Sequence, residues 1–431
     1  MSSLNRRVFL GAATAAALSA SRLQAAPSES FRVALIGCGG MGNNHLGLLA
    51  QRSDLKVAWL CDVDSQRLAE SAKKVEAAGK PAPQLTGDLR KVLDDRTLDA
   101  VWIATPDHWH TPAALLAMAA GKHVYVEKPC SHNVREGRLL VEGARKHSRI
   151  VQVGTQSRST AAVREAIDLV QGGAVGDVLS VKAWNSQRRG NIGHKQPSAP
   201  PSNLDFDTWL GPAPERPYQA NLLHGIWRFW YDYGAGDIGN DGVHEIDIAR
   251  WGLGVTAAPS RVVGLGAKYY FDDDQEFPDT QNCIFEWPGD GAIGHRRQLV
   301  FEQRDWSPYV QEGHENGVAF YGTKGYVIVG KGKGWAHYAE RNKLVAERPS
   351  SPDLAAHHQN FLDSIRGTAK PNASAEIGHQ SAVLVHLGNI ACRTGRSLNV
   401  NPDAEQIVGD PESAKMLTRA YRPGHWGTPA V

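Results

Sequence analysis

A glycine-rich turn between two strand-like runs decides how the N-terminal part of this chain can fold. The run Arg32–Ile36 leads into Gly37-Cys38-Gly39-Gly40-Met41-Gly42, and a helical stretch separates this turn from a second run, Val57–Cys61. In a GxGxxG turn the glycines allow a tight bend, a close backbone approach to a pyrophosphate and close helix–strand packing. The helix N-terminus also offers unpaired N–H groups to phosphates. The sequence therefore predicts a dinucleotide-binding unit.

Asp62 ends the second run, about twenty residues after the last glycine, where a carboxylate accepts hydrogen bonds from a ribose 2′-OH. A carboxylate at this point repels a 2′-phosphate, so NAD is expected as cofactor and NADP is disfavoured. The residues expected to contact it in this unit are Gly37, Gly39, Met41, Gly42 and Asp62.

The composition is that of an ordinary globular protein, and it excludes several classes of partner. The chain has 431 residues, of which 42% are hydrophobic and 21% charged, with a formal net charge of +2. This length suggests two or three domains, and no basic field is present to bind nucleic acid. The five cysteines show no framework spacing, and neither CxxC nor HExxH occurs, so no bound metal is expected.

The first 26 residues are similar to a twin-arginine signal peptide. Arg6 and Arg7 precede a short apolar run, Gly11–Ala20, and a cleavage site of the small-residue type follows within Leu23-Gln24-Ala25-Ala26. The prediction is export in the folded state, to the periplasm or another extracytoplasmic space. The apolar run is too short to span a bilayer, so no stable membrane anchor is expected after cleavage. The alternative is an alanine-rich helix that the mature protein keeps.

Two domains are expected after the signal. Residues 27–153 alternate apolar strands with helices, which predicts a doubly wound parallel sheet of Rossmann type. Residues 154–431 carry successive strands that mostly lack intervening helices, which predicts an α+β domain with a mainly antiparallel sheet. The strands expected in the two domains are Ala100–Ala104, His123–Val126, Ile150–Val153, Val178–Trp184, Arg261–Tyr270, Thr280–Trp287, Gly291–Phe301 and Tyr326–Val329. The expected helices include 112–120, 160–171, 242–251, 354–365 and 377–392.

Lys128 is the first candidate for chemistry. Glu127-Lys128-Pro129 directly follows the strand His123–Val126. This position lies at the carboxyl edge of the sheet, where doubly wound folds bind their ligands. A lysine there can hydrogen-bond an alcohol oxygen and help to move its proton. The alternative is a surface Glu–Lys pair before a turn.

His244 is the second candidate. A glycine-rich turn, Gly234–Gly242, precedes a helical stretch that puts His244, Asp247 and Trp251 on one face. A histidine beside carboxylates is suited to general acid–base catalysis on an alcohol. On these residues alone, a buried histidine held by Asp247 is equally consistent.

Taken together, these motifs resemble the glucose–fructose oxidoreductase, inositol dehydrogenase and MocA family of nicotinamide-dependent enzymes. The resemblance rests on the glycine turn with Asp62, on Thr105–His110, on Gly121–Val124 leading into Glu127-Lys128-Pro129, on the turn ending at His244, and on Gly378–Ala382 with Leu387–Ala391. It implies a Rossmann domain, a C-terminal domain with a large open sheet, and homodimers or homotetramers built on that sheet.

The resemblance also implies roles for individual residues. The implied catalytic residues are Lys128, His244 and Asp241, and further cofactor contacts are Thr105, His110, Glu127 and Lys128. The implied substrate residues are Gln156, Arg158, Trp227, Arg228, Asn240 and His244.

Two alternatives stay open for these roles. Many members have aspartate where this chain has Asn240, so either Asp241 supports His244 or His244 acts by hydrogen bonding without its usual partner. Arg158 faces the substrate or forms an interdomain salt bridge.

The expected function is NAD-dependent oxidation of a secondary hydroxyl in a small sugar or polyol. Because free NAD is scarce outside the cytoplasm, the signal and the nucleotide unit on one chain suggest a tightly held cofactor that is recycled internally. Two alternatives remain: cleavage of a glycoside, or a lyase reaction, through transient oxidation at C3; and a non-catalytic sugar-binding protein on the same fold.

Overall fold

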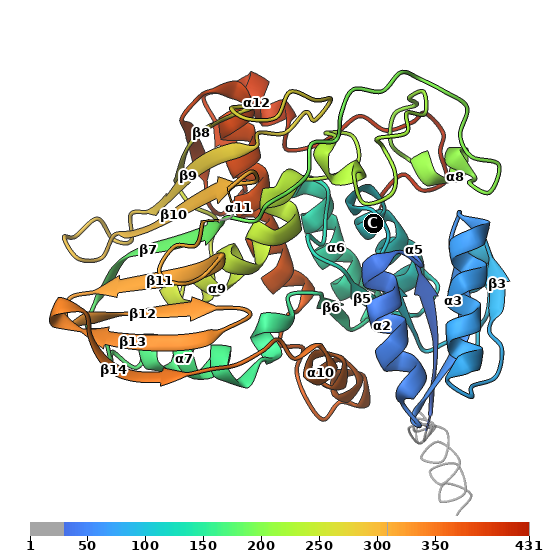
Figure 1. Ribbon diagram of the computed structural model, residues 1–431, viewed down its shortest axis with the longest axis horizontal. Coiled ribbons are helices and arrows are strands. Elements are labelled where there is room, and N and C mark those ends of the chain that lie inside the picture. The colour runs from blue at the N-terminus through green and yellow to red at the C-terminus, as the bar shows by residue number, and fades with distance from the viewer. Residues whose placement is uncertain (1–29, 308, 431) are drawn as a thin grey trace, which may run out of the picture.

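The computed structural model describes residues 30–307 and 309–430, and it places two β-sheets next to each other (Figure 1). The expected signal, residues 1–26, lies outside the described residues. In the stretch that is described, none of the helices combines the length and apolar content that a membrane crossing requires.

The first sheet has six strands, all parallel, in the order β3-β2-β1-β4-β5-β6. Their bounds are Phe31–Ile36 (β1), Leu55–Cys61 (β2), Gln84–Thr86 (β3), Ala100–Ile103 (β4), His123–Val126 (β5) and Val151–Val153 (β6). The strand order reverses between β1 and β4, and ligands bind at the carboxyl edge beside such a reversal. The predicted doubly wound Rossmann-type fold is confirmed.

The helices of this half are α2 (Gly40–Gln51), α3 (Ser65–Ala77), α4 (Leu89–Leu93), α5 (Asp107–Ala119) and α6 (Val134–His147). Helix α5 begins five residues before its expected start at Pro112, so the proline lies inside the helix. A proline has no N–H to donate to the carbonyl four residues earlier. That carbonyl, of His108, instead accepts a hydrogen bond from Arg419 Nη2 at 2.7 Å.

The second sheet has ten strands in the order β14-β13-β12-β11-β7-β10-β9-β8-β15-β16. Strands β7 and β10 pair in parallel and the other pairs are antiparallel, as expected for a mainly antiparallel sheet. The bounds are Val178–Asn185 (β7), Arg261–Ala267 (β8), Thr280–Trp287 (β9), Arg297–Arg304 (β10), Asn316–Gly322 (β11), Gly325–Gly330 (β12), Gly334–Ala339 (β13), Lys343–Arg348 (β14), Leu398–Asn401 (β15) and Gln406–Val408 (β16).

Three helices cover one face of this sheet: α7 (Ala161–Gln171), α9 (Val243–Leu253) and α11 (Ala375–Thr394). They share a buried apolar core with Phe285, Phe301 and Phe320 of the strands. The remaining elements are η1 (Gln156–Ser159), α8 (Phe206–Leu210), η2 (Trp227–Phe229), η3 (Ile238–Gly242), η4 (Glu340–Asn342), α10 (Leu354–Arg366) and α12 (Pro411–Lys415).

Helix α10 belongs to the first core, although it comes late in the chain. Phe361 and Leu362 pack with Leu35, Trp102 and Tyr125 of the parallel sheet. The expected division at residue 153 therefore separates the two sheets, whereas the apolar core of the first half is completed by the C-terminal part of the chain.

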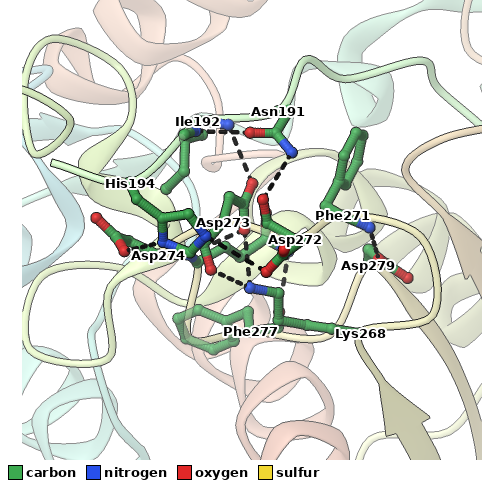
Figure 2. A network of polar contacts seen from close by, with 12 residues as sticks. Asn191, Ile192, His194, Lys268, Phe271, Asp272, Asp273, Asp274, Phe277 and Asp279 are labelled. Atoms are coloured by element: carbon green, nitrogen blue, oxygen red, sulfur yellow. Dashed lines mark hydrogen bonds and ion pairs between the residues drawn. The ribbon is translucent and has the colours of Figure 1, made fainter.

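A long insertion, residues 186–235, connects β7 to the elements before α9 and contains α8. It lies above α5 and α3 in Figure 1. Carboxylates of the loop after β8 anchor it, as Figure 2 shows: Asp273 accepts a hydrogen bond from Ile192 N at 3.0 Å, and Asp274 accepts one from His194 Nδ1 at 2.6 Å. Lys268 pairs with Asp273 at 2.9 Å. These contacts tie the insertion to the large sheet.

Candidate active site

A cleft of about 360 Å³ lies at the carboxyl edge of the parallel sheet, between that sheet and the insertion. It brings together most of the residues expected from the sequence. Those that line it are Gly37, Gly39, Met41, Asp62, Thr105, His110, Glu127, Lys128, Trp227, Arg228 and Asn240. Gln156, Arg158, Asp241 and His244 do not line this cavity, and Gly42 packs beneath it.

The glycine turn is shaped to receive a pyrophosphate. Gly37 has φ +95°, and a Cβ there would lie 2.5 Å from the carbonyl oxygen of Ala104. A Cβ on Gly42 would lie 1.9 Å from the carbonyl oxygen of Gly37. A Cβ on Gly40 would meet no described atom within 4 Å outside its own helix backbone and chain neighbours, so the space in front of Gly40 is open. Within the described chain no side chain caps the N-terminus of α2, so its N–H groups can bind a phosphate.

Asp62 is held in place by two backbone donors. Its Oδ2 accepts from Cys38 N at 2.6 Å, and its Oδ1 accepts from Asp64 N at 2.8 Å. Burial raises the pKa of its carboxyl group. Arg67 of α3 also lines the cleft.

Lys128 links the two halves of the molecule. Its Nζ donates to the carbonyl oxygen of Asn240 at 2.7 Å. The neighbouring Glu127 accepts a hydrogen bond from His45 Nε2 at 3.0 Å, and His45 Nδ1 lies 2.8 Å from His358 Nε2 of α10. Burial alone would raise the pKa of Glu127, but the His45 hydrogen bond and the Lys128 ammonium bring it down to about 2. Glu127 is therefore an ionised carboxylate beside the lysine.

Asp107 is a cleft residue that the sequence did not single out as part of the site. It lies at the start of α5, accepts a hydrogen bond from Ala235 N at 3.1 Å and lines the cavity. Burial raises its pKa to about 7, against the lowering effect of Lys128 and Arg228. Its position just after β4, at the sheet edge that holds Lys128, was the signal that could have found it.

His110 joins the loops that follow β4 and β5. Its Nδ1 lies 2.7 Å from the carbonyl oxygen of Pro129, and its Nε2 lies 2.9 Å from that of Thr105. The predicted contact residue thus also fixes the loop after Lys128 against the loop after β4.

Asp241 binds cations instead of His244. Its Oδ1 lies 3.0 Å from Lys331 Nζ, and its Oδ2 pairs with Arg189. These cations hold the pKa of Asp241 far below its usual range, against the effect of burial. An ionised, paired carboxylate of this kind anchors the turn before α9 and is not available to transfer a proton. Of the two open alternatives, the geometry favours a histidine without its usual partner.

His244 itself is buried at the start of α9. Among the described residues its Nδ1 has no hydrogen-bond partner. Burial, with the Lys331 and Lys128 ammonium groups nearby, lowers the pKa of His244 well below its ordinary value. The imidazole is therefore neutral and a weaker base than an exposed histidine.

Arg158 does not line the cleft but forms a buried salt bridge, which lies within the C-terminal half and not between the two halves. Its Nε and Nη2 donate to Asp247 of α9 at 2.7 and 2.9 Å, and its guanidinium lies over the Trp251 ring at 4.8 Å. Both partners of the pair are almost fully buried. Gln156 begins the same short helix, η1, and its Oε1 is buried with no partner in the described chain.

Breaking the Arg158–Asp247 pair should destabilise the fold. Changing Arg158 to methionine leaves the Asp247 carboxylate buried beside α11, at an expected cost of about 3–5 kcal/mol in the free energy of unfolding. Urea denaturation at pH 7 measures this cost. The control Arg396→Met removes an exposed arginine paired with Asp410 and should cost no more than about 1 kcal/mol. An unchanged unfolding midpoint with a raised KM would instead assign Arg158 to substrate.

The fold and the cleft define a class of protein, an oxidoreductase with an NAD-binding Rossmann domain. Residues 31–155 match the family model described as "Oxidoreductase family, NAD-binding Rossmann fold", and residues 162–427 match "Oxidoreductase family, C-terminal alpha/beta domain". The chain belongs to the glucose–fructose oxidoreductase, inositol dehydrogenase and MocA family.

Curated relatives match over part of their length. An inositol 2-dehydrogenase of Saccharopolyspora erythraea is 29% identical over 60% of this chain and 63% of its own. A levoglucosan dehydrogenase of Pseudarthrobacter phenanthrenivorans is 28% identical over 54% of each chain. A glycosyl hydrolase family 109 protein of Saccharopolyspora erythraea is 35% identical, over 35% of this chain and 34% of its own. The chain thus spans between a third and two thirds of these relatives.

Solved structures share the fold. The aldose–aldose oxidoreductase of Caulobacter crescentus, complexed with glycerol, superposes with a TM-score of 0.65 at 21% identity, covering 86% of this chain and all of that one. A levoglucosan dehydrogenase complexed with NADH gives 0.65 at 19% identity, over 86% of this chain and 100% of that chain.

Proposed function

We propose that this protein oxidises a secondary hydroxyl group of a sugar or polyol, with NAD rather than NADP as hydride acceptor. The observation that carries the proposal is the position of Lys128: its ammonium lines the cleft at the carboxyl end of β5, directly after the ionised Glu127. The glycine turn and the doubly anchored Asp62 fit the pyrophosphate and the ribose of the cofactor. The dehydrogenases among the relatives support this reading.

When bound, NAD supplies the nicotinamide C4 that takes up hydride. Lys128 uses one N–H on the carbonyl oxygen of Asn240 and keeps two to donate to the alcohol oxygen of a substrate. A donor fixed in this way stabilises negative charge that develops on the oxygen as its proton leaves. His244 is buried outside the cavity lining, so it supports the turn that carries Asn240 and does not contact the substrate. Trp227 and Arg228 of the insertion offer an aromatic face and donors to the hydroxyl-rich substrate.

The test is direct. Denaturing the purified protein and identifying any released nucleotide by mass should yield NAD, and a screen of sugars and polyols should then find one that reduces it. A protein that contains NADP, or that reduces added NAD with no sugar or polyol, would contradict the proposal.

We further propose that the cofactor remains bound between turnovers. The insertion closes over the β2–α3 loop that carries Asp62: Asn203 Nδ2 donates to Asp64 at 2.8 Å, and His224 Nε2 lies 3.0 Å from the same carboxylate. His224 also lines the cleft. A cofactor kept beneath the insertion would suit an enzyme that is exported with NAD already bound. Export of the folded protein is what the N-terminal arginine pair suggests.

Residues 417–430, here called the C-terminal clasp, hold the insertion against the first domain. Arg422 N donates to the carbonyl oxygen of Pro212, and its guanidinium pairs with Asp207 of α8 at 2.6 Å. Trp426 packs on Trp109 of α5 with ring centroids 5.3 Å apart. Arg419 pairs with Glu136 of α6 at 2.7 Å. The clasp therefore connects α8 to α5 and α6.

Ending the chain at Tyr421 should speed the loss of the cofactor. This truncation removes the Arg422 and Trp426 contacts but keeps Arg419 on Glu136. If the clasp keeps the insertion closed, the dissociation rate of bound nucleotide should rise about ten-fold, the equivalent of about 1.4 kcal/mol. Release into a nucleotide trap, with the full chain carrying Arg396→Met as control, measures the rate. An unchanged rate would show that the clasp plays no part in retention.

Two alternative functions make different predictions. The family 109 glycosyl hydrolase relatives fit a glycosidase or lyase that works through transient C3 oxidation, and solvent deuterium appearing at the neighbouring carbon would identify that route. A sugar-binding protein without catalysis would bind ligand yet turn over no substrate, with Lys128 intact or replaced.

The expected homo-oligomer also remains a proposal. The open face of the large sheet exposes Leu265, Val263 and Ile284, on the adjoining strands β8 and β9. Apolar side chains of this kind favour burial against a second copy. Light scattering should give the mass of a dimer or tetramer, and a monomer would contradict the proposal.

A further inference from the structure

Two cysteine sulfurs meet between helix α11 and the large sheet. Cys283 lies on β9, on the face that α11 covers, and Cys392 lies in the last turn of α11. Their Sγ atoms are 3.8 Å apart, which is contact distance for two sulfurs, and the residues are 109 positions apart in the chain. The thiols are free, and no step of the proposed reaction uses them.

Two glycines make the approach possible. Gly264 is the register partner of Cys283 on β8, and a Cβ there would lie 2.9 Å from Cys392 Sγ. Gly388 lies one turn before Cys392, and a Cβ there would lie 3.1 Å from Cys283 Sγ. Each sulfur therefore occupies space that a side chain at Gly264 or Gly388 would fill. Because both positions are glycine, α11 can pack close enough to β8 and β9 for the two thiols to touch.

The two thiols differ in access. Cys283 is fully buried, whereas Cys392 is partly exposed near the end of its helix. An oxidant in solution would therefore reach Cys392 first, and Cys283 would be the second thiol, already in contact with it. By contrast, Cys38 Sγ faces the carbonyl oxygen of Cys61, at 3.9 Å.

We propose that Cys283 and Cys392 are a redox modification site that closes to a disulfide when the folded protein meets a small disulfide such as oxidised glutathione. Cys392 loses its proton and attacks one sulfur of the oxidant, whose S–S bond breaks and releases one glutathione thiolate. Cys283 then loses its proton and attacks the Cys392 sulfur, which expels the second glutathione. The two cysteines give up two protons and two electrons, and the oxidant leaves as two reduced glutathione molecules.

The disulfide would restrict the movement of α11, which packs on α9 beside the active site. Ser381 of α11 donates to Asp247 at 2.7 Å, and Gln380 accepts from Arg250 Nη1 at 2.7 Å. Asp247 and Arg250 belong to α9, the helix whose second residue is His244. Tying α11 to β9 therefore stiffens the support of α9. Because the bond closes a long loop, we expect the unfolding temperature to rise by about 5 °C.

Mass analysis tests the proposal. The purified, cofactor-loaded protein is incubated with oxidised glutathione, unfolded in the presence of an alkylating agent and digested. The expected result is a peptide that contains Cys283 linked to one that contains Cys392, in the wild type and in the control Cys130→Ser. Cys283→Ser should stop at a glutathione adduct on Cys392. Full alkylation of both residues, a glutathione adduct on Cys392 of the wild type without the cross-link, or a bond between Cys38 and Cys61 in its place would overturn the proposal.

Discussion

Replacing Lys128 by alanine should lower kcat about a thousand-fold and leave the amount of bound nucleotide unchanged. The ammonium is the cleft donor placed to stabilise charge on a substrate oxygen, and removing such a group costs roughly 10²–10⁴ in rate. Within the described chain the ammonium donates a single hydrogen bond, to the carbonyl oxygen of Asn240, so the fold should persist. Single-turnover reduction of bound nucleotide by the identified sugar measures the effect.

Lys122 provides the matched control. It also lies in the first domain, but its ammonium donates to the carbonyl oxygens of Asp95 and Leu98, and it does not line the cleft. Lys122→Met should lower stability and leave kcat within about two-fold, because its contacts are structural. A Lys128→Ala variant that turns over as fast as the wild type would remove the lysine from the mechanism.

The free energy of unfolding should fall steeply as the pH drops below about 6.5. Burial lowers the pKa of several histidines, to about 3 for His108 and His386 and to about 4 for His357 and His123. The unfolded chain, with ordinary histidine pKa values, therefore takes up these protons first. Above the histidine pKa of the unfolded chain, the neutral buried histidines cost the folded state nothing. As the pH falls from that pKa toward the lower histidine pKa values of the folded state, the free energy of unfolding decreases.

Buried carboxyl groups oppose part of this loss. Burial raises the pKa of Asp107 to about 7 and of Glu245 to about 8, so the folded state holds their protons and gains stability as the pH falls. Burial lowers the pKa of eleven histidines, and the lowering is large for seven of them: His108, His123, His132, His244, His357, His358 and His386. Four carboxyl groups have raised pKa values: Asp62, Asp107, Glu245 and Asp305.

The seven strongly shifted histidines less the four carboxyls give a net uptake on unfolding of about three protons, which corresponds to about 4 kcal/mol per pH unit between pH 6 and 5. Urea unfolding at several pH values gives this slope. His386→Gln removes one titrating group and should reduce the uptake by about one proton. A stability that stays flat or rises over this interval would contradict the assignment of these histidines as neutral and buried.

Local constraints explain what the sequence could predict. The glycine turn is recognisable because its glycines are required by contacts within a few residues. A Cβ on Gly42, for example, would clash with the carbonyl oxygen of Gly37. Lys128 could be placed because it directly follows a short buried strand. Strand β9 and helix α7 follow clear periodic patterns, and their observed bounds lie within one residue of those expected.

Contacts between distant segments explain what the sequence could not predict. Arg158 finds its partner on α9, 89 positions later, so nothing nearby in the chain distinguished a salt bridge from a substrate contact. Helix α10 completes the first core from the far end of the chain, where its pattern predicts only an amphipathic helix. Strand β14 is exposed along its whole length, so it lacks the alternation that marks a half-buried strand.

The spectrum of reduced nicotinamide tests the central claim most directly. Purified protein receives a candidate sugar with no added coenzyme, and the near-ultraviolet absorbance of the protein-bound nucleotide is followed. We predict a single equivalent of reduced nucleotide in the wild type, and none on the same time scale in Lys128→Ala, although that variant still carries NAD. Protein that purifies without nucleotide and reduces none when NAD is added, or equal reduction in both proteins, would contradict hydride transfer beside Lys128.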